Sequence, residues 1–211
     1  MVSKTKWAIA GAATALIGGA AAYYVRERQT EQPDYTVVRQ DDPFELRDYP
    51  ELLTARVSLT GSRERTLNRA FSRLAAYIFA RDRPGRDIAM TAPVIQAQDR
   101  KIAMTAPVMQ DASSDPGTWQ VRFVMPKEYT LETLPTPPAD IALETVPRRR
   151  LAVIRFAGSA GDAALRGKED ELRRWLEREG LQPVGRFEYA FYNSPFIPPF
   201  LRRNEVMVPV A

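Results

Sequence analysis

The chain has 211 residues, 45% of them hydrophobic and 27% charged, which is typical of a folded domain with a core and not of a disordered chain. It contains no cysteine and no histidine, which excludes disulfides, thiol nucleophiles, Ser-His-Asp triads and imidazole ligands to a metal ion. Its 30 basic and 26 acidic residues leave a formal charge of +4 without the concentrated basic stripe that nucleic-acid binding requires, so we expect no nucleic-acid partner.

The N-terminus carries an apolar run without a charge, from Trp7 to Val25, with basic residues on both sides. A helix rises about 1.5 Å per residue, so this run reaches about the thickness of the hydrocarbon core of a bilayer. Two interpretations stay open for residues 1–25: a cleaved signal peptide, or an uncleaved transmembrane helix that anchors the chain in a membrane. Because the run stays apolar to its end, the anchor is favoured. Residues 26–34 are then a polar linker, and residues 35–211 a membrane-anchored or exported domain on the outer, periplasmic or extracytoplasmic side.

From residue 35 onward, the spacing of apolar residues predicts strands and helices in turn. Phe44 to Tyr49 and Leu52 to Leu59 are expected to be strands. A helix is expected from Arg63, with Ser62 as its N-cap, to just before Pro84, because apolar residues there recur on one helical face. These residues are Leu67, Phe71, Leu74 and Ile78.

The heptapeptide IAMTAPV occurs twice, at Ile88 to Val94 and at Ile102 to Val108. Both copies have the length of a strand, and the polar stretch QAQDR lies between them, so we predict a hairpin of two strands. The proline of each copy lacks an N–H and suits a strand edge. The methionines, Met90 and Met104, are adaptable side chains that suit the wall of a pocket.

The second part of the chain repeats the pattern of the first. After strands at Trp119 to Met125 and Ile141 to Val146, the same spacing that separates Pro50 from Gly61 separates Pro147 from Gly158. Each pair encloses a predicted strand, and each glycine is followed by a predicted helix. The remaining elements are a strand at Leu151 to Phe156, a helix at Asp162 to Gly180, and strands at Phe187 to Tyr192 and Glu205 to Pro209. We therefore predict an α+β fold: a distorted antiparallel β-barrel of two similar halves with two flanking α-helices, plus the N-terminal hydrophobic helix.

Five segments carry a resemblance to a known family. They are FELRDYP at Phe44 to Pro50, AFSRLAAYI at Ala70 to Ile78, KIAMTAPV at Lys101 to Val108, WQVRFVMP at Trp119 to Pro126 and YNSPFIPPFLRRNEV at Tyr192 to Val206. In this order, and over about residues 35–209, the sequence resembles the SOUL heme-binding family. The resemblance implies a distorted antiparallel barrel of two similar halves flanked by two helices, and binding of heme or a related tetrapyrrole. We expect a non-catalytic domain whose partner is heme or another flat, amphiphilic small molecule. It also implies a more general relation to bacterial effector-binding domains.

Histidine is not available as a ligand to heme iron in this chain. The iron would be bare, bound to water, or held by a methionine or a tyrosine, with Met104, Met90 and Tyr77 as candidates. A tetrapyrrole also needs a broad apolar surface and cations for its propionates. The residues expected to bind the cofactor lie on the first helix, in the second heptapeptide and in the C-terminal apolar stretch. They are Arg65, Arg69, Phe71, Arg73, Leu74, Tyr77, Ile78, Met104, Phe196, Phe200 and Arg203.

The apolar stretch from Phe196 to Leu201 should not stay in water, and its prolines disfavour a helix. We expect it to be a lid over a ligand, a contact with a membrane, or a cover of the core. Two further functions stay open for the whole domain. One is an enzyme that acts on a tetrapyrrole or its ester, with carboxylates such as Glu45 and Glu205, or tyrosines, as acid or base. The other is a structural or interaction module whose pocket is filled by side chains.

Overall fold

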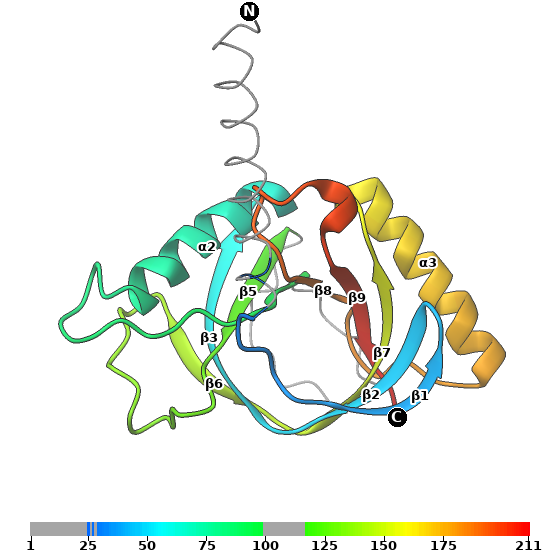
Figure 1. Cartoon of the computed structure of the whole chain (residues 1–211), viewed down its shortest axis with the longest axis horizontal. Helices are drawn as coiled ribbons and strands as arrows, with labels where there is room; N and C mark the ends of the chain where they lie inside the picture. Colours follow the sequence, from blue (N-terminus) through cyan, green and yellow to red (C-terminus); the bar gives the residue numbers. More distant parts are fainter. Residues whose placement is uncertain (1–24, 26, 28, 99–116) are drawn as a thin grey trace, which may run out of the picture. The chain divides into compact units, whose positions relative to one another are not determined.

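The structure is a computed structural model that describes residues 25 and 27 and residues 29–98 and 117–211 (Figure 1). The chain divides into two compact units, residues 1–31 and residues 32–211. The predicted N-terminal hydrophobic helix and the second IAMTAPV copy with Met104 lie outside the described residues. Among those that are described, no helix is long and apolar enough to cross a membrane.

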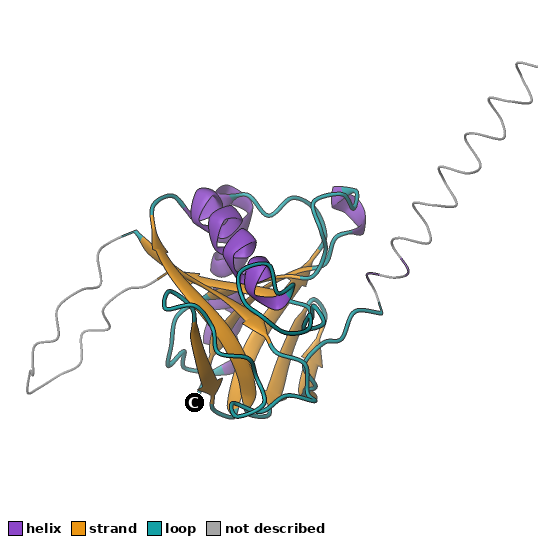
Figure 2. Cartoon of the chain, turned by 90° about the vertical axis from the view of Figure 1, so that its left-hand side faces the viewer, coloured by secondary structure: helices purple, strands orange, loops and turns teal. Residues whose placement is uncertain are grey.

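The unit that starts at Gln32 is an antiparallel sheet with two helices (Figures 1 and 2). The strands are β1 (Thr36–Asp41), β2 (Phe44–Tyr49), β3 (Leu52–Thr60), β4 (Val94–Gln98), β5 (Thr118–Val124), β6 (Ala142–Val146), β7 (Arg149–Phe156), β8 (Glu188–Phe191) and β9 (Asn204–Pro209). The helices are α2 (Arg63–Ile78), α3 (Asp162–Glu179) and the short 3₁₀ helix η1 (Pro199–Leu201). The predicted strands outside the heptapeptide region and both predicted helices are confirmed, and β1 is an additional strand.

The strand order has a twofold pattern around the central pair β4–β8. Moving outward, one side runs β8-β9-β7-β2 and the other runs β4-β5-β3-β6. On one side α3 connects β7 to β8, and on the other α2 connects β3 to β4. The outer strand of each side is exchanged: β2 precedes β3 in the sequence but pairs with β7, and β6 precedes β7 but pairs with β3.

The predicted barrel is an open, curled sheet that forms a half-barrel (Figure 1). Within the described part of the chain, β1 and β6 are edge strands with one neighbour each, so the ladder does not close. The sequence pattern did not reveal this, because closure depends on whether the two edge strands, β1 and β6, pair with each other. All residues of β1 are exposed, and an irregularity in register between Val37 and Arg39 bends the strand where it pairs with β2.

The first IAMTAPV copy is not the predicted strand. Strand β4 begins at Val94, the last residue of that copy, and continues to Gln98, into the polar stretch that we predicted to be a linker. Ile88 is instead a core residue, and the Thr91 hydroxyl donates to the carbonyl of Val124. Gln96, which suggested a linker, is fully buried, and its Nε2 donates to the carbonyl of Arg63 at 3.0 Å. An internal hydrogen bond thus allows a polar residue in a central strand.

Both helices pack on the outer face of the curl (Figure 1). α2 covers β3 and β5, and α3 covers β7 and β9. α3 ends as predicted at Gly180, whose φ of 66° lies in the left-handed region that glycine adopts without strain. Because strand side chains alternate, every second residue faces the opposite, inner side of the curl, which no helix of the described chain covers.

Candidate functional site

An open pocket lies between α2 and β3. Its volume is about 590 Å³, within the range of roughly 300–1,000 Å³ that ligand sites occupy. Val57 and Leu59 of β3 and Ala76 of α2 form its apolar wall. Its polar lining consists of Asn68, Arg69, Ser72 and Arg73 of α2 and Asp140 from the loop before β6. The pocket therefore combines an apolar surface with cationic side chains.

The two arginines of the pocket differ in their partners. Arg73 binds both carboxylate oxygens of Asp140, with Nε 2.5 Å from Oδ2 and Nη2 2.6 Å from Oδ1, and it also pairs with Asp82. The hydrogen bond from Arg73 holds the pKa of the Asp140 carboxyl below its ordinary value, so Asp140 stays ionised and neutralises Arg73. Arg69 is exposed and has no carboxylate partner among the residues that the structure describes. Of the two arginines, Arg69 keeps its charge available to a ligand.

Three of the residues expected to bind the cofactor belong to the core. Leu74, Tyr77 and Ile78 belong to α2 and are buried where this helix packs on the sheet. None of them lines the pocket. The Tyr77 hydroxyl donates to the carbonyl of Pro135 at 2.7 Å, and burial raises its pKa. A protonated phenol that already has a partner is a poor ligand for iron. These side chains hold α2 on the sheet, so their role toward the pocket is to position its wall.

The other predicted residues of this region lie in separate places. Phe71 is 37% exposed and packs edge-on against Phe123, with ring centroids 5.4 Å apart. Arg65 is exposed on α2 but does not line the pocket. Met90 is partly buried against the core under α2. Of the predicted residues on α2, Arg69 and Arg73 line the pocket, whereas Arg65, Phe71, Leu74, Tyr77 and Ile78 do not.

The sequence analysis missed the strand residues of the pocket, Val57 and Leu59. Their alternation inside a predicted strand was a signal that they face one side of a sheet together. The alternation did not show that α2 packs on this side of the sheet, because the face on which a helix packs is decided by tertiary contacts. Asp140 carried no signal of its own, since it lies in a loop far along the chain from Arg73.

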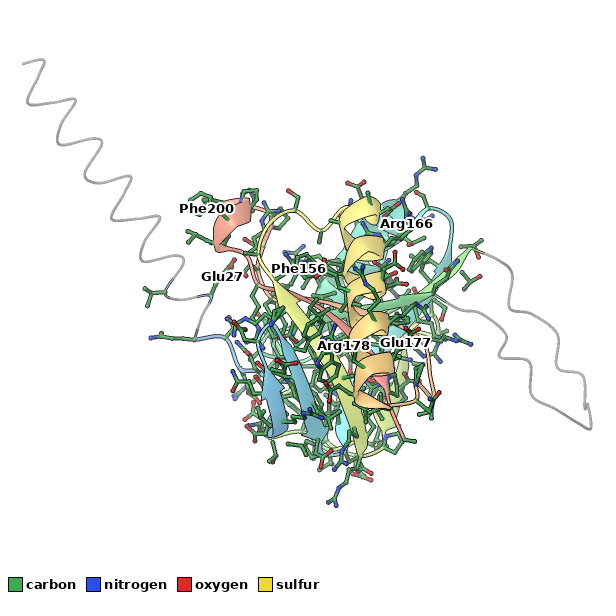
Figure 3. All side chains as sticks on the ribbon, turned by 90° about the vertical axis from the view of Figure 1, so that its right-hand side faces the viewer. Glu27, Phe156, Arg166, Glu177, Arg178 and Phe200 are labelled. Carbon is green, nitrogen blue, oxygen red and sulfur yellow. The ribbon has the colours of Figure 1, made fainter. Side chains whose placement is uncertain are left out.

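A second exposed feature is the apolar loop, which we define as residues 195–201. Phe196 is 86% exposed and Phe200 is 74% exposed, whereas Ile197 between them is buried. Figure 3 shows Phe200 on the outer side of the loop, pointing away from the sheet. Three roles were expected for this stretch: a lid, a membrane contact or a cover of the core. Ile197 covers the core, whereas the two phenylalanines do not.

The inner face of the curl carries a buried ionic cluster. Arg47 of β2 and Glu205 of β9 form two hydrogen bonds of 2.9 and 3.0 Å, and both side chains are fully buried. Glu45 accepts from Arg47 at 2.6 Å, and the hydroxyl of Tyr192 donates to Glu205 at 2.7 Å. Arg203, a predicted propionate partner, also binds Glu205, at 2.7 Å, and lies over the Tyr192 ring. Arg203 is therefore already occupied inside the domain.

Glu205 is saturated in this cluster. Burial alone would raise the pKa of its carboxyl, but the hydrogen bond and charge of Arg47 and the charge of Arg203 outweigh burial, and the pKa lies below its ordinary value. The carboxylate is thus ionised near neutral pH, and its oxygens already accept from two guanidinium groups and a hydroxyl. It has little capacity to take a proton from a substrate, so the arrangement does not suit the general base that the enzyme hypothesis assigned to Glu205.

A line of alternating charges crosses the rest of the inner face. Arg149 binds Glu188 at 2.6 Å, and Arg122 lies 3.7 Å from the same carboxylate. Arg122 also binds Glu144 at 3.0 Å, and Glu144 binds Arg56 at 2.9 Å. Since each carboxylate is shared between arginines, none is left to hold a cation. In the described ranges, no group of three or more acidic side chains converges in a way that could hold a metal ion.

The sequence of the whole domain matches one family. The family described as SOUL heme-binding protein matches residues 30–100 and 96–209, and each of these segments contains one copy of IAMTAPV. The chain belongs to the SOUL family. This match confirms the resemblance that the five sequence segments of this SOUL domain indicated. A comparison with curated protein sequences gives no match.

Solved structures show the same fold at low sequence identity. The C-terminal domain of EcmrR has a TM-score of 0.58 and 12% identity, and the match covers 84% of this SOUL chain and 98% of that domain. A hydrolase encoded by lin2189 from Listeria innocua has a TM-score of 0.52 and 13% identity, with 80% and 91% of the two chains covered. At such identities the likeness concerns the fold alone.

The described pocket fits part of a heme group. Leu59 and Ala76, which are partly exposed, offer an apolar surface for a macrocycle, and Arg69 offers a charge for a propionate. None of the residues that line the pocket is a methionine, a tyrosine or a histidine, the usual side chains that ligate heme iron. The pocket of this SOUL domain therefore suits the ring and its carboxylates, and offers no axial ligand.

Proposed function

We propose that this domain binds heme or a related tetrapyrrole in the open pocket between α2 and β3, without catalysing a reaction on it. One observation carries the proposal: an apolar wall lies beside Arg69, whose charge has no carboxylate partner among the described residues. The wall would contact one face of the ring, and Arg69 would pair with a propionate. Membership of a heme-binding family supports the choice of ligand.

Recognition by this site rests on the ring and its carboxylates. When bound, heme would supply a redox-active iron, and the chain would bind and orient the macrocycle that carries it. Because the pocket lining offers no iron ligand, metal-free protoporphyrin is expected to bind about as tightly as hemin. A titration of the full chain that showed binding of hemin alone would contradict this assignment of the site.

Arg69→Ala is expected to weaken protoporphyrin binding by at least about tenfold, because a charge-assisted hydrogen bond contributes roughly 1.5–3 kcal/mol and each 1.4 kcal/mol is a factor of ten. The measurement is quenching of porphyrin fluorescence in a titration with the full chain. Arg65→Ala is the matched control: it removes an exposed arginine from the same helix that does not line the pocket, and should leave the affinity unchanged. Equal losses in both variants would indicate unspecific attraction to a basic helix.

We also propose that residues 1–25 act as a signal peptide or membrane anchor and that the domain lies on the extracytoplasmic side. The uncharged run from Trp7 to Val25 and its basic flanks support this. The expected result is that the chain, expressed with its N-terminus intact, is found in the membrane fraction or is exported after cleavage, as judged by fractionation and by the mass of the product. An intact chain that stayed in the soluble cytoplasmic fraction would refute the proposal.

A further inference from the structure

The apolar loop exposes two aromatic rings that a folded domain would normally bury. Phe196 and Phe200 are the two most exposed large apolar side chains of the described residues, at 86% and 74%. Burying one such ring is worth roughly 1.5–3 kcal/mol. The short stretch between them shows that the loop can reach the core, since Ile197 is only 3% exposed. The loop thus places Ile197 inside and both rings outside.

The exposed position of the rings is held by hydrogen bonds under the loop. Arg202 donates from Nε to the carbonyl of Ile197 at 2.7 Å and from Nη2 to the carbonyl of Pro195 at 2.8 Å. The carbonyl of Pro199 accepts from the backbone N–H of Gly158 at 2.9 Å, which ties η1 to the segment before α3. Three prolines restrict the backbone further. The loop is therefore a built surface with its rings presented outward.

The charges beside the rings have one sign. From Asn193 to Arg203 the sequence contains no acidic residue and ends in two arginines. Arg203 is neutralised by Glu205, but Arg202 binds only carbonyl groups and has no carboxylate partner within the described ranges. Aromatic rings next to an uncompensated cation are suited to the interface of a bilayer with anionic headgroups.

The start of the domain lies at the base of the same loop. Nη1 of Arg203 donates to Oε1 of Gln32 at 3.2 Å, and Gln32 is the first residue of the folded unit. Residues 26–31 separate Gln32 from the apolar run that ends at Val25, and a fully extended chain over these seven steps reaches at most about 25 Å. A run anchored in a membrane would thus keep the base of the loop near that membrane. This step rests on the anchor proposed above.

We propose that the apolar loop is a membrane-contact element that inserts Phe196 and Phe200 into the interface of an anionic lipid bilayer. Arg202 lies beside the headgroup phosphates, and Ile197 stays in the core to hold the loop upright. The proposal does not depend on the tetrapyrrole pocket, whose residues lie on α2, on β3 and before β6.

The test places a reporter in the loop of the full chain. The Phe200→Trp variant of the full chain is mixed with phosphatidylcholine vesicles that contain phosphatidylglycerol and lipids brominated on their acyl chains. We expect the emission of the added indole to shift to shorter wavelength and to be quenched by the bromines. The emission of the unsubstituted chain is subtracted. Adding Phe196→Ser to this variant should reduce the quenching, because the loop then loses its second ring.

The matched control is Val184→Trp. Val184 is 57% exposed and follows the C-terminal end of α3, whereas the apolar loop is tied to the segment before its N-terminal end. An indole at position 184 is therefore expected to remain unquenched on the same vesicles. Should Phe200→Trp fail to fold, as judged by circular dichroism, Phe196→Trp reports on the same loop.

Three outcomes would overturn the proposal. Equal quenching at positions 200 and 184 would mean that the loop has no special contact with lipid. An unquenched loop, together with weaker porphyrin binding by a Phe196→Ser/Phe200→Ser double variant, would make the loop a lid. An unquenched loop, together with a dimer that this double variant dissociates, would make the partner a second copy of the chain.

Discussion

Glu205→Ala is expected to lower the free energy of unfolding by about 3–5 kcal/mol, because the buried Arg47 guanidinium loses its buried counter-ion and both hydrogen bonds to it and keeps only Glu45 as an acidic partner. Arg47 and Glu205 are both fully buried, and Arg203 and Tyr192 depend on the same carboxylate. Urea unfolding followed by circular dichroism measures the difference. Glu177→Ala, an exposed carboxylate on α3 that Figure 3 labels, should change stability by less than about 0.5 kcal/mol.

The contribution of Glu205 should also depend on pH. Its pKa is lower in the folded chain than in the unfolded chain, because Arg47 and Arg203 outweigh the effect of burial. The stabilisation is therefore complete above the unfolded pKa of about 4.3 and is lost as the pH falls through the lower, folded pKa. The difference in unfolding free energy between the native chain and Glu205→Ala should shrink only below about pH 4. A difference that shrank between pH 5 and pH 7 would contradict an ionised Glu205.

Trp175→Ala is expected to lower the free energy of unfolding by about 3–5 kcal/mol as well, for a different reason. Trp175 of α3 is fully buried and stacks on Phe44, with centroids 5.2 Å apart and planes at 4°. Its Nε1 donates to Oδ2 of Asp41 at 2.8 Å. Removing the indole opens a cavity between α3 and the sheet and deletes this hydrogen bond.

The same unfolding experiment has a control on the same helix. Arg178→Ala changes an exposed residue of α3 and should alter stability by less than about 0.5 kcal/mol (Figure 3). Porphyrin affinity should be unchanged in Trp175→Ala at temperatures where the variant is folded, because the proposed pocket lies under α2 in the other part of the sheet. A combined loss of stability and affinity would show that the pocket depends on α3.

Most elements were predictable because their periodicity is local. The alternation of Trp119, Val121 and Phe123 predicted β5, and the helical spacing from Leu67 to Ile78 predicted α2. Prediction failed at β4, where all four residues from Val94 to Ala97 are buried and no alternation is left to detect. The burial of Gln96 there depends on Arg63, thirty-three positions earlier in the chain.

The candidate site was predictable in part. Arg69 and Arg73 looked equivalent in the sequence, since both are basic residues of one helix beside an apolar stripe. The structure separates them, because Asp140, sixty-seven positions away, binds Arg73 and leaves Arg69. The stretch from Phe196 to Leu201 was expected not to stay in water, but in the structure Ile197 occupies the core and the rings of Phe196 and Phe200 stay exposed.

By itself the sequence determined the family, the kinds of secondary structure, the twofold pattern of proline, strand, glycine and helix, and the absence of histidine and cysteine. These features depend on residue types and on neighbours a few positions apart. The tertiary structure alone decided that the sheet is open, that strands are exchanged between its two sides, and that Arg47 meets Glu205 across 158 positions. It also decided which charges are neutralised and which rings stay exposed, because burial and ion pairing are set by segments that only folding brings together.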